Sequence, residues 1–153
     1  MNYEQSIDYI HSIPKFRRPL GNANLEKLLT HLDNPQKKLK FIHIAGTNGK
    51  GSTAAMTAEI LKKSDFKTGL FTSPYLEVFN ERIRINGENI TDNDLAEYVT
   101  RVKAIMKKNN ALVSEFAFIT AVSFLYFYEK QCDIVVLEVG MGGKLDATNV
   151  IDS

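Results

Sequence analysis

The chain has 153 residues, enough for one compact domain with a hydrophobic core but short for a two-domain enzyme. Its 19 lysine and arginine residues nearly balance 18 acidic residues, so no net charge draws it toward nucleic acid or an anionic membrane. A single cysteine, Cys132, excludes an internal disulfide and a cysteine-based metal cluster.

Neither the start of the chain nor its apolar segments predict membrane targeting. The first residues include Glu4 and Asp8 and lack the basic start and apolar run of a signal peptide. The longest apolar run, residues 116–128, is bounded by glutamates and is too short to span a bilayer. We therefore expect a cytoplasmic monomer without a membrane or nucleic-acid partner.

The predicted elements begin with two amphipathic helices, at residues 3–12 and 24–32, which would form a lid or a packing layer. A short apolar strand at 41–45 then leads through a glycine-rich turn into a helix at 52–63. His43 within this strand is predicted to be a hydrogen-bonded core histidine. A second short apolar strand follows at 67–72.

The second half of the chain predicts a hairpin, two helices and a last strand. Residues 82–85 alternate in polarity and meet Asn86-Gly87, a pair that accepts the positive φ angles of a tight turn. Thr91 and Ser114 are good N-caps for helices that run to about residues 107 and 130.

Residues 133–139 are apolar on both faces, which is typical of a strand in the middle of a parallel sheet. The order of elements predicts an α/β fold: a three-layer P-loop-type domain with a mostly parallel sheet and a small β-hairpin insertion. Because the sheet appears unfinished at Ser153, we expect a truncated domain.

The strongest functional signal is the glycine-rich loop between the first strand and its helix. Small residues let the backbone wrap around phosphate oxygens, and the helix start adds partial positive charge. Lys50 would reach the β- and γ-phosphates of ATP as the catalytic cation, and Ser52 or Thr53 would place a hydroxyl on Mg²⁺. The predicted nucleotide-binding residues are Gly46, Thr47, Asn48, Gly49, Lys50, Gly51, Ser52 and Thr53.

This loop departs from the general P-loop pattern. Ile44 stands where that pattern has its first glycine, and Gly51 separates Lys50 from Ser52. Instead, the loop resembles that of the Mur ligase family, and its letters GTNGKGS resemble the folylpolyglutamate synthase/dihydrofolate synthase branch. Three further stretches agree with the branch in order: residues 72–76 with 79–83, residues 114–116, and residues 138–143 with 145–149.

The resemblance implies an ATP-dependent ligase that adds L-glutamate to the carboxylate of a folate or a dihydropteroate through an acyl phosphate, with ATP and Mg²⁺ as cofactors. Residues 1–153 would be the N-terminal part of the ATP-binding central domain. The later strands, the metal-binding histidine, the modified lysine and the C-terminal domain of the family have no counterpart in this sequence.

The resemblance also implies the remaining site residues. Ser73 would be a second Mg²⁺ ligand beside Ser52. Glu138 ends the last buried strand, at the sheet edge where open α/β sheets bind ligands, and its carboxylate suits Mg²⁺ unless it lies in solvent. Substrate contacts are expected from Phe79, Asn80, Arg82, Glu115 and Phe116.

Two features leave the substrate open. Ala117 replaces a carboxylate that the family commonly has near its pterin pocket, and Phe79 would either stack on a pterin or anchor its loop in the core. The sequence does not distinguish dihydrofolate synthase from folylpolyglutamate synthase activity. Other hypotheses are a peptidoglycan-precursor or cyanophycin-type ligase, a generic P-loop switch or kinase, and a nucleotide-binding fragment without catalysis.

Overall fold

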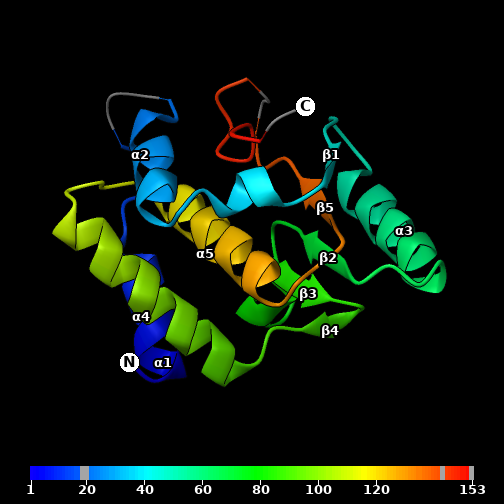
Figure 1. Cartoon of the computed structure of the whole chain (residues 1–153), viewed down its shortest axis with the longest axis horizontal. Coiled ribbons are helices and arrows are strands. Elements are labelled where there is room, and N and C mark those ends of the chain that lie inside the picture. Colours follow the sequence, from blue (N-terminus) through cyan, green and yellow to red (C-terminus); the bar gives the residue numbers. More distant parts are fainter. Residues whose placement is uncertain (18–20, 142–143, 152–153) are drawn as a thin grey trace.

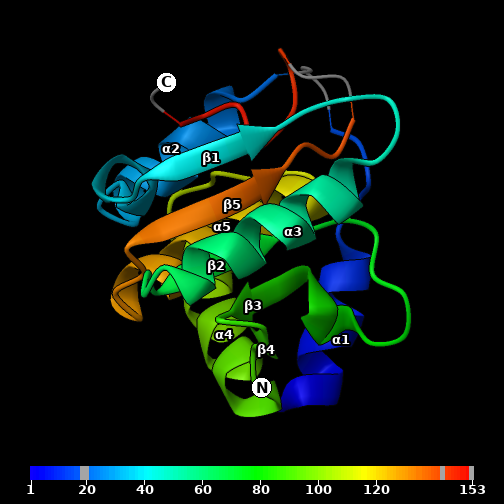
Figure 2. The same ribbon diagram turned by 90° about the vertical axis from the view of Figure 1, so that its right-hand side faces the viewer.

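The computed structural model describes residues 1–17, 21–141 and 144–151 (Figure 1). A mixed sheet separates two layers of helices. On one face lies α3 (Lys50–Lys63), and on the other α5 (Glu115–Glu129) with α4 (Asp92–Lys108) beside it. The view in Figure 2 shows α3 in front of the sheet and α4 and α5 behind it. Helices α1 (Tyr3–Ser12) and α2 (Ala23–His31) pack on the α4 and α5 layer.

The sheet has five strands in the order β1-β5-β2-β3-β4. Its strands are β1 (Phe41–Ile44), β2 (Thr68–Phe71), β3 (Ile83–Ile85), β4 (Glu88–Asn89) and β5 (Ile134–Glu138). β1, β5 and β2 run parallel, whereas the β3–β4 hairpin adds antiparallel strands beside β2. The parallel strands therefore end at one edge of the sheet, and the loops that follow them gather there.

The predicted fold class is confirmed, and the observed boundaries of the elements differ from the predicted ones by at most two residues. The largest shift is in α3, which begins at Lys50 and not at residue 52. Gly49 is its N-cap with a φ of 74°, a left-handed conformation that glycine adopts without steric cost. The predicted caps are also confirmed, since the side chains of Thr91 and Ser114 accept hydrogen bonds from the backbone N–H groups of Asp94 and Ala117.

The predicted hairpin turn is confirmed at Asn86 and Gly87, which have φ angles of 51° and 83°. The prediction for His43 is wrong in one respect. Because β1 is the edge strand, the side chain of His43 is exposed, although its Nε2 lies 2.8 Å from the hydroxyl of Thr148. An apolar sequence pattern does not distinguish an edge strand from a central one. The prediction for β5 is confirmed, because this strand lies between β1 and β2 and runs parallel to both.

Helix α5 is the centre of the core and is buried on nearly all sides, as its largely apolar sequence predicts. It lies so close to the sheet that a Cβ atom at Gly69 of β2 would come within 2.8 Å of the ring of Phe127. The ring of Phe124 packs edge-on against Phe41 of β1, with centroids 5.3 Å apart. This close contact holds the sheet and its loops in a defined position.

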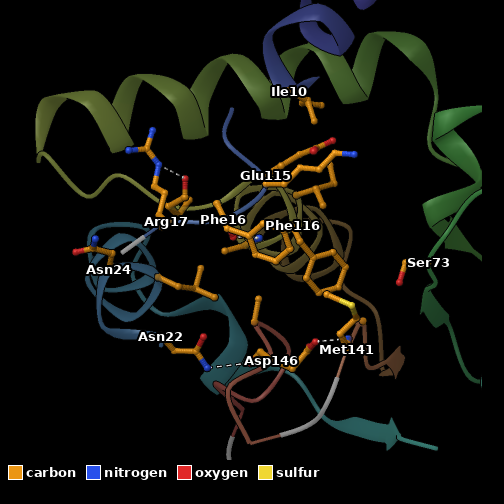
Figure 3. Close-up of a pocket in the computed structure, with 18 of the residues that line it drawn as sticks. Ile10, Phe16, Arg17, Asn22, Asn24, Ser73, Glu115, Phe116, Met141 and Asp146 are labelled. Carbon is orange, nitrogen blue, oxygen red and sulfur yellow. Dashed lines mark hydrogen bonds between the residues drawn. The ribbon is translucent and has the colours of Figure 1, made fainter. Parts of the chain in front are cut away.

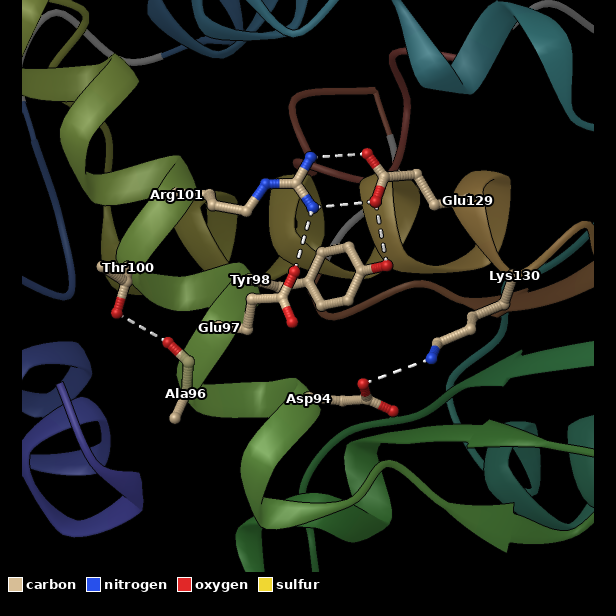
Figure 4. A network of polar contacts seen from close by, with 8 residues as sticks. All are labelled: Asp94, Ala96, Glu97, Tyr98, Thr100, Arg101, Glu129 and Lys130. Atoms are coloured by element: carbon tan, nitrogen blue, oxygen red, sulfur yellow. Dashed lines mark hydrogen bonds and ion pairs between the residues drawn. The ribbon is translucent and has the colours of Figure 1, made fainter.

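A polar cluster joins the middle of α4 to the C-terminal end of α5 at the surface (Figure 4). Arg101 donates two hydrogen bonds to the carboxylate of Glu129, with N···O distances of 2.8 and 2.6 Å. The hydroxyl of Tyr98 donates a third at 2.9 Å. The paired Arg101 guanidinium and the Tyr98 hydroxyl outweigh partial burial and hold the pKa of Glu129 below its usual 4.5.

We expect Glu129→Gln to lower the free energy of unfolding by about 0.2–1 kcal/mol at neutral pH, because the ion pair is partly exposed. Since the folded-state pKa of Glu129 is depressed, its contribution is present above pH 4.5 and is lost as the pH falls through the lower folded-state pKa. Urea unfolding of both proteins at neutral pH and at about pH 3 measures this difference.

The matched control is Glu97→Gln, which removes a more exposed carboxylate 3.5 Å from Arg101 and is expected to change stability less. An effect of Glu129→Gln that has the same size at both pH values would contradict the ion-pair explanation.

Candidate functional site

The glycine-rich loop lies between β1 and α3, at the carboxyl edge of the parallel strands. Lys50 is the first residue of α3 and is half-buried, and its Cγ lies 3.6 Å from the position of a Cβ atom on Gly46. Ser52 and Thr53 are exposed in the first turn of the helix. The first backbone N–H groups of a helix have no intrahelical acceptor, so this turn can hold an anion.

Glu138, at the end of β5, faces this turn of α3. Its side chain is 4% exposed, so the alternative of a solvent-exposed carboxylate at the strand end does not apply. One carboxylate oxygen accepts a hydrogen bond from the backbone N–H of Ser73 at 3.0 Å. Both oxygens lie within 3.9 Å of the position of a Cβ atom on Gly51. Gly51, Ser73 and Glu138 therefore surround one small space.

This space fits a divalent cation next to a nucleotide. Mg²⁺ prefers oxygen ligands and is commonly held by one or two protein groups together with phosphate oxygens and water. The carboxylate of Glu138 and the hydroxyls of Ser52 and Ser73 are oxygen donors of that kind, and a side chain at Gly51 would fill the space in front of the carboxylate. Within the described ranges, no three His, Cys, Asp or Glu side chains form a metal-binding group.

Beside this edge lies a cavity of about 710 Å³, lined by the first turn of α5, parts of α1 and α2, and the loops that follow β2 and β5. Figure 3 shows Phe116 near the middle of the cavity lining, between Glu115 and Asp146. Ser73 belongs to this lining as well as to the space around Glu138. The cavity therefore adjoins the space around Glu138 and the first turn of α3.

The loop after β5 forms one wall of the cavity. The carboxylate of Asp146 is buried and accepts hydrogen bonds from the backbone N–H groups of Met141 and Thr148 at 2.8 and 2.9 Å. A Cβ atom on Gly140 would lie 2.7 Å from the ring of Phe116, so this wall touches the aromatic ring directly. His43 is exposed overall, but its ring lies against Thr148 of this loop. The partial loss of solvent there lowers the pKa of His43, although the charge of Asp146 opposes the shift.

The predicted substrate residues do not all lie in the cavity. Phe79, Arg82, Glu115 and Phe116 line it. Phe79 also belongs to the hydrophobic core, as expected of a ring that anchors its loop, whereas stacking on a pterin stays a prediction. Asn80 lies outside the lining. Its amide donates to the carbonyl of Ile90 and the carboxylate of Asp92, at 2.8 and 2.9 Å, which fastens the 3₁₀ helix η2 (Phe79–Arg82) to the start of α4.

Sequence reasoning assigned no role to His11, which the structure places in the cavity wall. Its Nδ1 lies 3.0 Å from a carboxylate oxygen of Glu115, and its ring meets that of Phe79 edge-on at 5.8 Å. The only sequence signal is a histidine near the end of an amphipathic helix, because its partners are far away in the chain.

A phosphate-binding loop at a helix start, a buried carboxylate at the next strand end and an adjoining cavity define an α/β protein of the P-loop type. No protein-family model matches the chain. The curated folylpolyglutamate synthase of Lacticaseibacillus casei is 43% identical over 156 residues, which cover 99% of this chain and 36% of the relative. The dihydrofolate synthase/folylpolyglutamate synthase of Bacillus subtilis is 39% identical over 155 residues, 98% of this chain and 36% of the relative.

A comparison with solved structures finds the same group of enzymes. The apo form of the L. casei enzyme matches with a TM-score of 0.93 at 43% identity, covering 99% of this chain and 38% of that one. A complex of a folylpolyglutamate synthase with AMPPCP and folate matches equally well, also at a TM-score of 0.93. The bifunctional enzyme of Yersinia pestis matches with a TM-score of 0.92 at 30% identity, covering 100% of this chain and 37% of that one.

Over nearly its whole length the chain is homologous to folylpolyglutamate and dihydrofolate synthases of the Mur ligase family, as its four motifs predicted. It spans 36% to 38% of the length of these relatives and corresponds to an N-terminal portion of them. In the part of the chain that the structure describes, no helix has the length and apolar character needed to cross a membrane.

Proposed function

We propose that this chain supplies the nucleotide site and part of the substrate site of an ATP-dependent ligase that joins L-glutamate to the carboxylate of a folate or a dihydropteroate. In this proposal, residues 1–153 are the N-terminal part of the ATP-binding central domain. The observation that carries it is the position of Ser73, which is shared by the cavity and by the space around Glu138. A carboxylate in the cavity would lie beside the γ-phosphate of ATP bound at the glycine-rich loop.

Each group has one task in the reaction. The γ-phosphoryl group moves from ATP to an oxygen of the substrate carboxylate, which forms an acyl phosphate and releases ADP. The amine of glutamate then attacks the acyl carbon, phosphate leaves with the bonding electrons, and the nitrogen loses a proton as the amide forms. Lys50 and the α3 N–H groups neutralise charge on the phosphates, and Ser52, Ser73 and Glu138 would hold Mg²⁺ against them.

The substrate would lie along Phe116, whose ring is half-buried and faces the cavity. A flat pterin ring offers the face that an aromatic side chain stacks upon. The complex of a related enzyme with AMPPCP and folate supports a folate as the ligand of this cavity. Ala117 lies in the same lining, so the carboxylate missing there leaves Phe116 as the main recognition group we expect.

The test is ADP release in the presence of Mg²⁺, ATP and glutamate, with tetrahydrofolate or dihydropteroate added in turn. It is made with this chain and with a form extended to the length of its relatives. We expect release that requires a pterin substrate. Phe116→Ala should raise the KM for that substrate by about tenfold, whereas Phe66→Ala, at an exposed phenylalanine outside the cavity, should not.

ADP release that is independent of any pterin in both forms would contradict the folate assignment. It would favour a ligase of the same family that acts on a different carboxylate, such as a peptidoglycan-precursor or cyanophycin-type enzyme.

A further inference from the structure

Arg82 lies beside the site of phosphoryl transfer. It ends η2, and its carbonyl accepts a hydrogen bond from the backbone N–H of Thr72 at 3.1 Å. Thr72 directly precedes Ser73, whose own N–H is bonded to Glu138. Arg82 is one of the residues that line the cavity, and its guanidinium lies against the rings of Tyr75 and Phe79, which line the cavity too.

The guanidinium of Arg82 is held in place, but no described residue forms an ion pair with it. Its central carbon lies 5.2 Å from the ring centroid of Tyr75 and 5.3 Å from that of Phe79. Its Nε is buried without a hydrogen-bond partner, and no carboxylate of the described residues forms an ion pair with it. Burial lowers the pKa of Arg82, which reflects the poor solvation of this cation.

Glu115 is near enough for its negative charge to raise the pKa of Arg82, but its carboxylate is hydrogen-bonded to another residue. Its carboxylate is bonded to His11 at 3.0 Å, and its backbone N–H to the carbonyl of Pro14 at the same distance. A partly buried cation without a counter-ion is unfavourable, so the cavity is prepared for an anionic ligand. The planar fork of a guanidinium matches a carboxylate best, because two parallel N–H···O bonds form.

We infer that Arg82 binds the carboxylate of the substrate's glutamyl group that is not being phosphorylated, and that it thereby makes this site prefer folates over dihydropteroate. The inference rests on the proposed function. A folate ends in a glutamyl group with two carboxylates, separated by three carbon atoms. One must lie at Ser73 for phosphoryl transfer, which leaves the other to bind nearby. Dihydropteroate has a single carboxylate, which the reaction itself uses.

The other cationic side chains of the cavity are less suited to this role. Arg17 donates its Nε–H to the carbonyl of Val113 at 2.8 Å, and Figure 3 shows it on the opposite side of the cavity from Ser73. Lys15 is exposed on the same loop. His11 is bonded to Glu115. Among the described residues, Arg82 is therefore the cavity cation whose backbone is bonded to the residue before Ser73 and whose guanidinium forms no ion pair.

The experiment compares the affinities of two ligands, tetrahydrofolate and dihydropteroate, by isothermal titration calorimetry with Mg²⁺ and AMPPCP present. We expect Arg82→Gln to raise the Kd of tetrahydrofolate roughly 10- to 100-fold, as the loss of a charge-assisted pair predicts. The Kd of dihydropteroate should change by less than about twofold. Arg84→Gln is the matched control, since this neighbouring arginine also has a buried, unpaired Nε but does not line the cavity.

An equal loss of affinity for both ligands, or no loss for either, would overturn the inference and leave the proposed function intact. A wild-type chain that binds neither ligand would overturn the proposed function and the inference with it. Circular dichroism and the melting temperature check folding. If Arg82→Gln is unfolded, Arg82→Lys is tested in its place. It keeps a positive charge beside the rings of Tyr75 and Phe79 but lacks the planar guanidinium, so a selective loss of tetrahydrofolate affinity is again expected.

Discussion

Replacement of Lys50 by alanine is expected to lower ATP-dependent turnover by about 10²–10³-fold, because a cation fixed at the β- and γ-phosphates stabilises charge that develops in the transition state. Lys50 suits this role because of its position. It is the first residue of α3, and the stem of its side chain packs along the glycine-rich loop at Gly46. Release of ADP with Mg²⁺, tetrahydrofolate and glutamate is the measurement.

The matched control for this prediction is Lys63→Ala. Lys63 lies in the last turn of the same helix, where its ammonium is 3.8 Å from Glu59 and largely exposed. We expect its loss to leave turnover within about twofold, because it lies at the opposite end of α3 from the phosphates and an exposed pair of this kind contributes little. Comparable turnover in Lys50→Ala and the wild type would remove Lys50 from the catalytic assignment.

The second large effect is expected for stability. Phe127→Ala should lower the free energy of unfolding by about 3–5 kcal/mol, because the ring is fully buried and its removal leaves a cavity over Gly69. The backbone of β2 approaches α5 closely only because position 69 has no side chain, so the surrounding residues are poorly placed to fill the space. Urea unfolding followed by circular dichroism measures the change.

Tyr128→Ala is the control for Phe127→Ala, since it truncates the next aromatic residue of the same helix. Tyr128 is 38% exposed, and the ammonium of Lys38 lies 4.9 Å from its ring centroid. We expect a change of less than about 1 kcal/mol. Similar losses of stability in the two variants would show that α5 is not packed against the sheet as described.

Much of the fold could be predicted because its signals are local. Thr91 and Ser114 cap the N–H groups that follow them within three residues, and Asn86-Gly87 accepts the φ angles that its own turn requires. The glycine-rich loop is likewise a continuous segment in which spacing, small size and a lysine predict phosphate binding. Such features depend on neighbours in the chain and are visible without a structure.

Long-range packing decided the features that the sequence left open. His43 belongs to an apolar strand, but only the strand order shows that β1 is at the edge and that this side chain is exposed. Asn80 stands within a family motif, yet its amide is used by Ile90 and Asp92. His11 gains a role because α1 brings it to Glu115, 104 positions along the chain.

By itself, the sequence predicted the α/β class, the helix caps at Thr91 and Ser114, the hairpin turn and the glycine-rich loop, since each depends on a few consecutive residues. The tertiary structure decided which side chains share the cavity, that Ser73 joins it to Glu138, and that Arg82 lies there without an ion pair to any described residue. The physical reason is that contacts between distant segments are set by the packing of helices on the sheet, and residue patterns along the chain do not record which surfaces meet.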